Sequence, residues 1–339
     1  MDLKEFLTVH KTFVVDTIRL WLFQLRFNAS CATEQDREKW EYSLLRKTHT
    51  VEKGLSLRNP RVGFGQQKVS ALLDELKRYQ QRFGKEHPGF IVYPLQTIGF
   101  WIDYTRKQGV DIGEIERRFE GFEGFEGFER FEGFERFEGV ERFEGAKKAS
   151  GVVLTTRDAQ QEGASGNFES VLRSRHSVRY FLDEPVAHEV IDRALAMAQL
   201  TPSACNRQAW KTHVFEGEAC RRLLKWHGGS RGFDEDIHQA IVVTANQKAF
   251  FYYEMYQAYV DGGLYGMNLV NALHSLGLGT IPLSCGFKQR KLKALHQMGI
   301  PAGEVPVLIV GFGYLPEEFM VAASVRKPIS ETNTYHGES

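Results

Sequence analysis

The second half of the chain alternates between strand-like and helix-like patterns of hydrophobic residues. Residues 240–245 form a continuous apolar run, which is typical of a central strand buried on both faces. Residues 305–313 repeat that pattern, and the helical pattern of 250–276 ends at Gly277, a position suited to a left-handed cap. The remaining predicted elements are helices over 168–174 and 186–200, and a strand over 212–215. A further helix follows that strand and runs through Lys225. This order of elements indicates an α/β or α+β layer fold.

The first part of the chain, residues 1–118, has a mainly helical pattern. Residues 69–79 carry apolar side chains at helical spacing, and a break is predicted from Gly84 to Pro94. The first 27 residues also follow a helical pattern. Two interpretations stay open for them: a helix docked on the rest of the protein, or a helix lying on a membrane surface.

The middle of the chain has low complexity. Residues 119–145 repeat Phe-Glu-Gly or Phe-Glu-Arg in nine triplets, with Val140 replacing one Phe. A period of three gives neither a helix nor a strand a continuous apolar face, so a flexible or partly helical insert is expected. The low complexity continues into a predicted linker. We therefore expect three regions: helical residues 1–118, repeat and linker residues 119–165, and a folded domain over 166–339.

Composition narrows the class of protein. The 339 residues are 42% hydrophobic and 25% charged, with no apolar run long enough for a transmembrane helix. The four cysteines form no CxxC pair, which argues against a structural zinc site and fits a reducing, cytoplasmic setting. The formal net charge is zero and no stretch is strongly basic, so nucleic acid is not an expected partner.

Arg175-His-Ser-Val-Arg179 is the first segment able to carry chemistry. Arg175, Ser177 and Arg179 alternate, so in an extended segment their side chains leave the same side. Two guanidinium groups and a hydroxyl at one place suit a phosphate or another cluster of anionic oxygens. Exposed Arg–Ser stretches are also common without any ligand.

The segment from Thr201 to Trp210 supplies small neutral polar side chains. Ser203, Asn206 and Gln208 can hydrogen-bond to the edge of a heteroaromatic ring, or they can cap backbone groups of a plain helix-to-strand loop. Trp210 is expected to pack in the core.

Two later segments complete the set. Gly277–Gly286 either forms a turn that lets the backbone approach a flat ligand, or continues a glycine-capped helix into an edge strand. Arg326 and Lys327 form a cationic pair near the C-terminus, which could equally lie on a solvated tail.

In their joint order, these segments in residues 168–336 resemble the nitroreductase family of flavin enzymes. The RxSxR element, the Pro-Ser-x-x-Asn-x-Gln loop, Gly-Leu-Gly-Thr and the late Arg-Lys-Pro occur in family order. The resemblance implies an α+β fold, a three-layer sandwich with a central mixed β-sheet flanked by helices, preceded by the mainly helical N-terminal region. It also implies FMN as cofactor and a homodimer with two FMN sites at the interface.

The resemblance assigns roles to individual residues. Arg175 and Arg326 would hold the FMN phosphate, with His176 and Ser177 along the ribityl side, and Arg179 would approach the N1–O2 edge of the flavin. Pro202, Ser203 and Asn206, with Gln208 in the same loop, would come from the partner subunit. The residues implied to line the flavin face and its N5 edge are Thr280, Ile281, Pro282, Ser284 and Gly286. No catalytic side chain and no metal is expected.

The implied activity is an FMN-dependent oxidoreductase. NAD(P)H would reduce the flavin, and a small acceptor of the nitroaromatic or quinone class would reoxidise it in a ping-pong mechanism. The chain departs from the family pattern at Ala209, where proline is usual. Flavin-dependent dehalogenases of this family bind an amino acid under a lid of acidic, tyrosine and lysine residues, and this lid has no counterpart between residues 215 and 240. That stretch holds a glycine-rich segment, residues 226–233, that is expected to cover the flavin, so dehalogenation is not expected.

The alternative is a non-catalytic protein. Residues 49–56 and 61–65 look like an extension found on nitroreductase-like proteins of bacterial surface-polysaccharide clusters. On that interpretation the chain is a flavin-fold scaffold that binds a partner.

Overall fold

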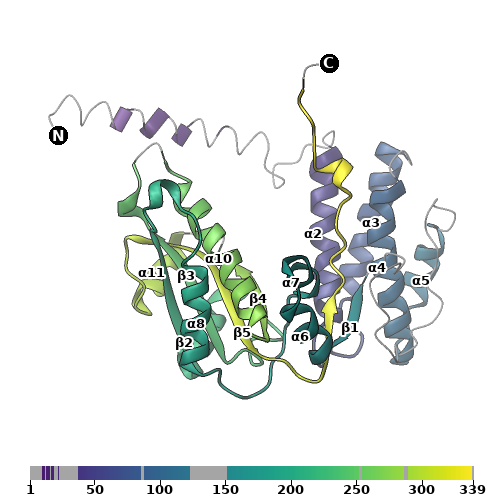
Figure 1. Ribbon diagram of the computed structural model, residues 1–339. Helices are drawn as coiled ribbons and strands as arrows, with labels where there is room; N and C mark the ends of the chain where they lie inside the picture. Colours follow the sequence, from purple (N-terminus) through teal and green to yellow (C-terminus); the bar gives the residue numbers. More distant parts are fainter. Residues whose placement is uncertain are drawn as a thin grey trace. The chain divides into compact units, whose positions relative to one another are not determined.

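The computed structural model divides the chain into two compact units, which are described separately (Figure 1). The sheet unit contains Met1–Arg26 and Leu154–Val321, and the helical unit contains Phe27–Val153 and Ala322–Ser339. The residues that the structure describes are 10–11, 13–15, 17–18, 22, 37–84, 88–122, 151–251, 254–285 and 289–337.

A four-stranded sheet forms the centre of the sheet unit. Its strands are, in spatial order, β2 (Trp210–Glu216), β3 (Gln239–Asn246), β5 (Glu304–Tyr314) and β4 (Leu278–Ser284). Neighbouring strands are antiparallel, and a parallel bridge from Ser177 to Thr280 makes the sheet mixed. Every residue of β3 from 239 to 245 is buried, as the continuous apolar run predicted. The strands predicted over 212–215 and 305–313 are confirmed as parts of β2 and β5.

One face of the sheet is covered by α8 (His188–Ala198) and α10 (Gln257–Ser275). Their apolar side chains share a core with alternate residues of β3 and β5, which include Ile241, Val243, Val310 and Phe312. Trp210 lies in this core as expected. It is 3% exposed and stacks on Tyr265 with ring centroids 5.0 Å apart.

The opposite face is covered by α9 (Gly217–His227) and the segment before β3. Ile237 is buried against the position of Gly311, which has the opposite orientation to Val310 and Phe312 on β5. The Cys220 thiol of α9 donates to the Ile237 carbonyl at 3.7 Å. Helices therefore lie on both faces of the sheet, and the predicted three-layer α+β sandwich is confirmed.

The helix predicted over residues 250–276 begins later than expected. Residues 247–249 form a single 3-10 turn, η3 (Gln247–Ala249), and α10 begins only at Gln257. The carboxylate of Glu254 is held by Arg207 and by the amide of Phe251, and a turn at residues 255–256 precedes α10. The predicted C-terminal cap is confirmed, because Gly277 has a φ of +82°.

The segment assigned to a linker is partly ordered, which corrects the prediction for its second half. Strand β1 (Val152–Thr156) pairs with β6 (Glu318–Ala322), and α6 (Arg157–Ser165) follows directly. The Thr156 hydroxyl caps α6 by accepting a hydrogen bond from Ala159 at 3.2 Å. Pairing with a strand 160 residues away left no local pattern to detect. The next helix, α7 (Phe168–Ser174), has the predicted bounds.

Helices make up the helical unit, as predicted. They are α2 (Arg37–Leu55), α3 (Gln66–Phe83), α4 (Pro88–Lys107) and α5 (Gly113–Glu120). The break predicted from Gly84 to Pro94 is shorter than expected, since α4 already begins at Pro88 and contains Pro94. Pro94 is tolerated because Ile91, Leu95 and other apolar side chains of α4 are buried, and burial offsets the roughly 3 kcal/mol that an internal proline costs.

The triplet repeat begins inside this unit. Phe119 and Phe122, its first two aromatic residues, are 1% and 4% exposed. The rest of the repeat, from residue 123, lies outside the described residues, as does most of the helix predicted for the first 27 residues. Within the described ranges, no helix combines the length and the apolar character that crossing a membrane requires.

Candidate functional site

The Arg175–Arg179 segment lies against the edge of the sheet. Ser177 forms a parallel bridge with Thr280 of β4, and the Val178 amide donates to the Thr280 carbonyl at 2.9 Å. Two of the segments singled out in the sequence are therefore neighbours, although the paired residues Ser177 and Thr280 are far apart in the chain. Of the alternatives for 277–286, the structure has a glycine-capped helix followed by an edge strand.

The two guanidinium groups of this segment differ in burial. Arg179 is 3% exposed and donates from Nη1 to the Ser177 carbonyl at 3.4 Å, whereas Arg175 is half-buried. Beside them the hydroxyl of Thr280 is 1% exposed and has no hydrogen-bond partner among the residues that the structure describes. Burying a hydroxyl without a hydrogen bond costs free energy of folding, so this edge suits a ligand with a polar group that would bond to it.

A polar network holds the start of the segment in place. The Ser174 hydroxyl lies 2.7 Å from Nε2 of His274 on α10, and His176 Nδ1 lies 2.8 Å from the Ser174 carbonyl. His274 is 2% exposed. Its burial, and then the charges of Arg175 and His176, lower the pKa of His274 to about 4. The ring is therefore neutral at pH 7, and its Nε2 shares a hydrogen bond with the Ser174 hydroxyl.

The loop after α8 has an unusual backbone. It contains η2 (Ala204–Asn206), and three of its residues have positive φ: Cys205 at +51°, Asn206 at +53° and Gln208 at +47°. A residue with a side chain loses roughly 1–2 kcal/mol in this left-handed region, somewhat less for Asn. Such strain persists only where the surroundings fix the backbone, and it is concentrated at functional sites.

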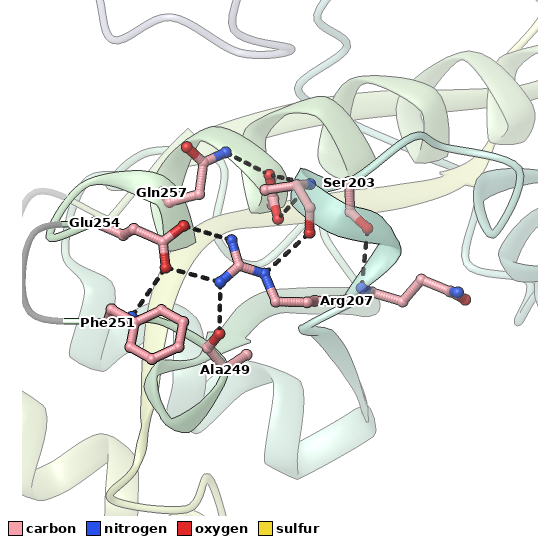
Figure 2. A network of polar contacts seen from close by, with 9 residues as sticks. Ser203, Arg207, Ala249, Phe251, Glu254 and Gln257 are labelled. Atoms are coloured by element: carbon pink, nitrogen blue, oxygen red, sulfur yellow. Dashed lines mark hydrogen bonds and ion pairs between the residues drawn. The ribbon is translucent and has the colours of Figure 1, made fainter.

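Arg207 supplies much of that fixation. Figure 2 shows its guanidinium between Glu254 and the Ala249 carbonyl. Nη1 donates to Ala249 at 2.9 Å and to Glu254 at 2.7 Å, Nη2 donates to the second oxygen of Glu254 at 2.6 Å, and Nε donates to Ala204 at 3.0 Å. The hydrogen bonds from Arg207 and from the Phe251 amide lower the pKa of Glu254 to about 2. The fork is thus fully charged at neutral pH.

A second attachment joins the same loop to α10. The buried carboxylate of Asp261 accepts from the Ala204 amide at 3.2 Å and from Gln257 at 2.7 Å. Further along α10, the Asn268 amide donates to the Thr201 hydroxyl at 2.7 Å. Together with His274, these residues let one helix hold both the loop and the Arg175–Arg179 segment.

The side chains predicted for the loop are accessible. Pro202, Asn206 and Gln208 are exposed, and Ser203 is half-buried, where its hydroxyl accepts from the Gln208 amide at 2.9 Å. The side-chain amide of Gln208 donates from Nε2 to Asn206 Oδ1 at 3.0 Å. The loop therefore presents a cluster of neutral hydrogen-bonding groups. It also contains a side-chain-to-backbone contact of the kind expected for a plain helix-to-strand loop.

The end of β4 combines buried and exposed candidate residues. Thr280 and Ile281 are buried, whereas Pro282 and Ser284 are exposed; Gly286 lies outside the described residues. The glycine-rich segment reaches this end of the strand, because His227 Nε2 lies 3.0 Å from the Ser284 carbonyl.

Arg326 belongs to the helical unit, whereas the other candidate residues belong to the sheet unit. There it donates to the Ser324 carbonyl and lies near Tyr93. Burial and the Glu52 carboxylate raise the pKa of Tyr93, and the Arg326 charge opposes that rise. Its assignment to a phosphate beside Arg175 stays a prediction.

Thiol and metal chemistry have little support among the described residues. Burial raises the pKa of Cys220 and of Cys285 to about 12, so both are protonated thiols at neutral pH. Cys205 is exposed. No three His, Cys, Asp or Glu side chains gather as metal ligands in the part of the chain that the structure describes.

Three residues of the site were not singled out in the sequence. Arg207, Glu254 and Asp261 hold the loop, but none belongs to a recognisable local pattern, and the two partners of the fork are 47 residues apart. Sequence alone offered only one signal: an arginine between two residues that were themselves candidates.

Fold and site together define an α+β domain with a cationic strand edge and a rigid polar loop, both suited to an anionic cofactor. The family model described as "Nitroreductase family" matches residues 172–250. A protein of Archaeoglobus fulgidus named "Putative NADH dehydrogenase/NAD(P)H nitroreductase" is 31% identical over 153 residues, covering 44% of this chain and 85% of that protein. The chain belongs to the nitroreductase family.

Two further proteins are similar to parts of this chain. Chloronitrobenzene nitroreductase of Comamonas testosteroni is 40% identical over 90 residues, which cover 23% of this chain and 40% of that protein. The other is a solved structure titled "putative nitroreductase in complex with fmn", from Desulfovibrio desulfuricans; the match covers 51% of this chain and 99% of that chain, with 22% identity and a TM-score of 0.44. The predictions of the family and of an oxidoreductase are confirmed, and the roles of single residues stay predictions.

Proposed function

We propose that this protein is an FMN-dependent oxidoreductase that takes electrons from NAD(P)H and passes them to a small acceptor of the nitroaromatic or quinone class. Family membership supports the class of reaction, and the names of the relatives support the reductant and the acceptor. Bound FMN supplies the redox chemistry, accepting a hydride and releasing electrons.

The strand edge at Thr280 is the observation that supports FMN as the cofactor. The buried Thr280 hydroxyl, which has no hydrogen-bond partner in the described part of the chain, lies next to a segment that contributes a buried and a half-buried guanidinium. An anionic, flat molecule with several hydrogen-bonding atoms fits this donor set. The residues present therefore fit FMN.

Each side chain has a defined task in this proposal. Arg175 binds the phosphate, with His176 and Ser177 beside it, and Arg326 is the second phosphate ligand that the resemblance assigns. Arg179 places a positive charge at the N1–O2 edge, where it stabilises negative charge. Thr280 and Ile281 border the ring, and no side chain of the protein has to act as a nucleophile or general base. The acceptor enters after the reductant has left, so one open face serves both.

A homodimer forms part of the proposal. Five large, mainly apolar side chains at the start of α10 repeat at helical spacing and are 44–52% exposed: Tyr256, which directly precedes the helix, and Tyr259, Val260, Leu264 and Met267 within it. An exposed apolar stripe of this kind marks a protein interface. A second copy docked there would lie next to the Ser203–Gln208 loop, which is attached to the same helix through Asp261. Each loop then completes the partner's flavin site.

The oligomeric state can be measured by size-exclusion chromatography with light scattering. The wild-type chain should have the mass of a dimer, and Leu264→Glu with Met267→Glu should give a monomer that has lost FMN. A monomeric wild-type chain that retains FMN would contradict the shared site.

The test of the function is a spectrum of the purified protein. A yellow preparation that absorbs at about 450 nm and is bleached by NADH or NADPH is expected, since oxidised flavin absorbs there and reduced flavin does not. A colourless protein that takes up no added FMN would instead favour the non-catalytic, partner-binding alternative.

A further inference from the structure

Arg207 lies between two residues assigned to flavin binding, but its own side chain faces the protein. The guanidinium donates four hydrogen bonds to three separate places: Glu254, the Ala249 carbonyl and the Ala204 carbonyl (Figure 2). It also lies 4.9 Å from the ring centroid of Phe250. One side chain thus connects η2, η3 and the turn before α10.

The backbone at Arg207 explains why this connection matters. Arg207 itself has ordinary helical angles, with φ −72°, whereas Asn206 before it and Gln208 after it are left-handed. The direction of the Asn206 and Gln208 side chains depends on this alternation. A fixed Arg207 side chain therefore determines where both neighbouring amide groups point.

We propose that Arg207 is a positioning residue, which through its fork on Glu254 holds the Ser203–Gln208 loop in the strained conformation that hydrogen-bonds the flavin. The inference rests on the proposed function for the identity of the ligand. Its structural part, the holding of a left-handed loop, stands on the contacts of Arg207 alone.

The guanidinium geometry is required, because a point charge could not make the same contacts. Arginine presents a planar fork that meets both oxygens of Glu254 and still reaches two carbonyls, whereas a lysine ammonium has three donors at one atom. Asp261 holds the Ala204 amide independently of Arg207. Loss of the fork should therefore loosen residues 205–208 without detaching the loop from α10.

The experiment compares Arg207→Ala, Arg207→Lys and Glu254→Gln with the wild-type protein. Arg221→Ala is the matched control, because Arg221 forms an exposed ion pair with Glu218 on α9 that touches neither loop nor turn. Two quantities are measured: the FMN dissociation constant, by quenching of flavin fluorescence, and the hydrogen exchange of the 203–209 peptide in flavin-free protein.

Arg207→Ala should weaken FMN binding about tenfold, as expected when the binding-competent loop falls to roughly a tenth of the population. Exchange of the 203–209 peptide should become faster, while exchange of α8 and the thermal midpoint of the sheet unit change little. Glu254→Gln should show a smaller shift in the same direction, and Arg221→Ala none. Arg207→Lys should fall between Ala and wild type.

Two results would overturn the inference. One is an Arg207→Ala protein with wild-type FMN affinity and wild-type hydrogen exchange. The other is an Arg207→Lys protein that behaves as the wild type, which would show that the positive charge is sufficient and the bidentate guanidinium geometry is not required. A wild-type protein that binds no FMN would contradict the proposed function instead, and the exchange measurement would still decide whether Arg207 holds the loop.

Discussion

Left-handed backbone angles fall on different residue types in two regions: residues 37–84 and 88–122 of the helical unit, and the site loop of the sheet unit. Within residues 37–84 and 88–122 every residue with positive φ is a glycine, Gly63, Gly65, Gly84 or Gly109, and each lies at a helix end or in a turn; Ser324, later in the same unit, has a φ of +47°. In the site loop of the sheet unit the same angles fall on Cys205, Asn206 and Gln208. Glycine takes these angles without strain, so the turns in residues 37–84 and 88–122 are favourable for stability. The loop has residues with side chains at angles where glycine would have less conformational strain, and such strain is typical of a functional site.

Polar contacts follow the same division. In the helical unit, Tyr79 donates to Glu41 and Tyr93 donates to Glu52, and both bonds join regular helices. In the sheet unit, Arg207 and Asp261 hold irregular segments. The predictions that follow test whether the polar groups of the sheet unit serve the site while those of the helical unit serve the fold.

The largest effect is expected from His274. Its pKa is about 4 in the folded protein and 6.5 when unfolded, so the unfolded chain binds the extra proton between these values. The free energy of unfolding should be fully retained above pH 6.5 and should fall towards pH 4 by on the order of 3 kcal/mol. Chemical denaturation at a series of pH values measures this. His274→Asn should remove most of the slope; an unchanged slope would mean that other groups cause it.

Arg175→Ala should weaken FMN retention about tenfold or more, because a charge-assisted hydrogen bond to phosphate is worth roughly 1.5–3 kcal/mol. Mixing this variant with Arg207→Ala sharpens the comparison. If each loop serves the partner's flavin, the mixed dimer has one fully intact site, with Arg175 from one chain and the loop from the other. Half of the wild-type high-affinity FMN sites should therefore return in mixed dimers. No recovery would show that loop and phosphate site act within one chain.

Tyr93→Phe tests the helical unit. The hydroxyl lies 2.7 Å from Glu52, whose side chain is 0% exposed, and its removal takes a hydrogen bond from a buried carboxylate. Such a loss costs about 1–3 kcal/mol, so thermal unfolding should occur at a lower temperature. Tyr335→Phe, at a residue that is 91% exposed, is the control. Equal midpoints in both variants would remove the stabilising role of this contact.

The sequence predicted the elements whose signal is local. Residues 240–245, of which all but Thr244 are apolar, indicated β3, and the spacing of apolar residues in 69–79 indicated α3. It missed features that depend on distant residues: the pairing of β1 with β6, and the turn at Glu254, which Arg207 imposes from 47 residues away. For the site, the order of motifs indicated which segments meet, and Ser177 does lie beside Thr280. The residues that hold those segments could not be predicted, because a buried carboxylate such as Asp261 has no sequence signature.

The smallest effect comes from exchanging glycine between the two units. Gly109 has a φ of +71° and a Cβ there would contact nothing, so Gly109→Ala changes only the backbone and should cost about 1 kcal/mol of stability. Cys205→Gly should do the reverse. It relieves a left-handed residue but adds freedom to the unfolded chain, so the expected gain is about 0.5 kcal/mol. Urea denaturation of both variants measures the difference. A Cys205→Gly protein that is less stable than wild type would show that the loop is not strained at this residue, and the contrast between the two units would then rest on Asn206 and Gln208 alone.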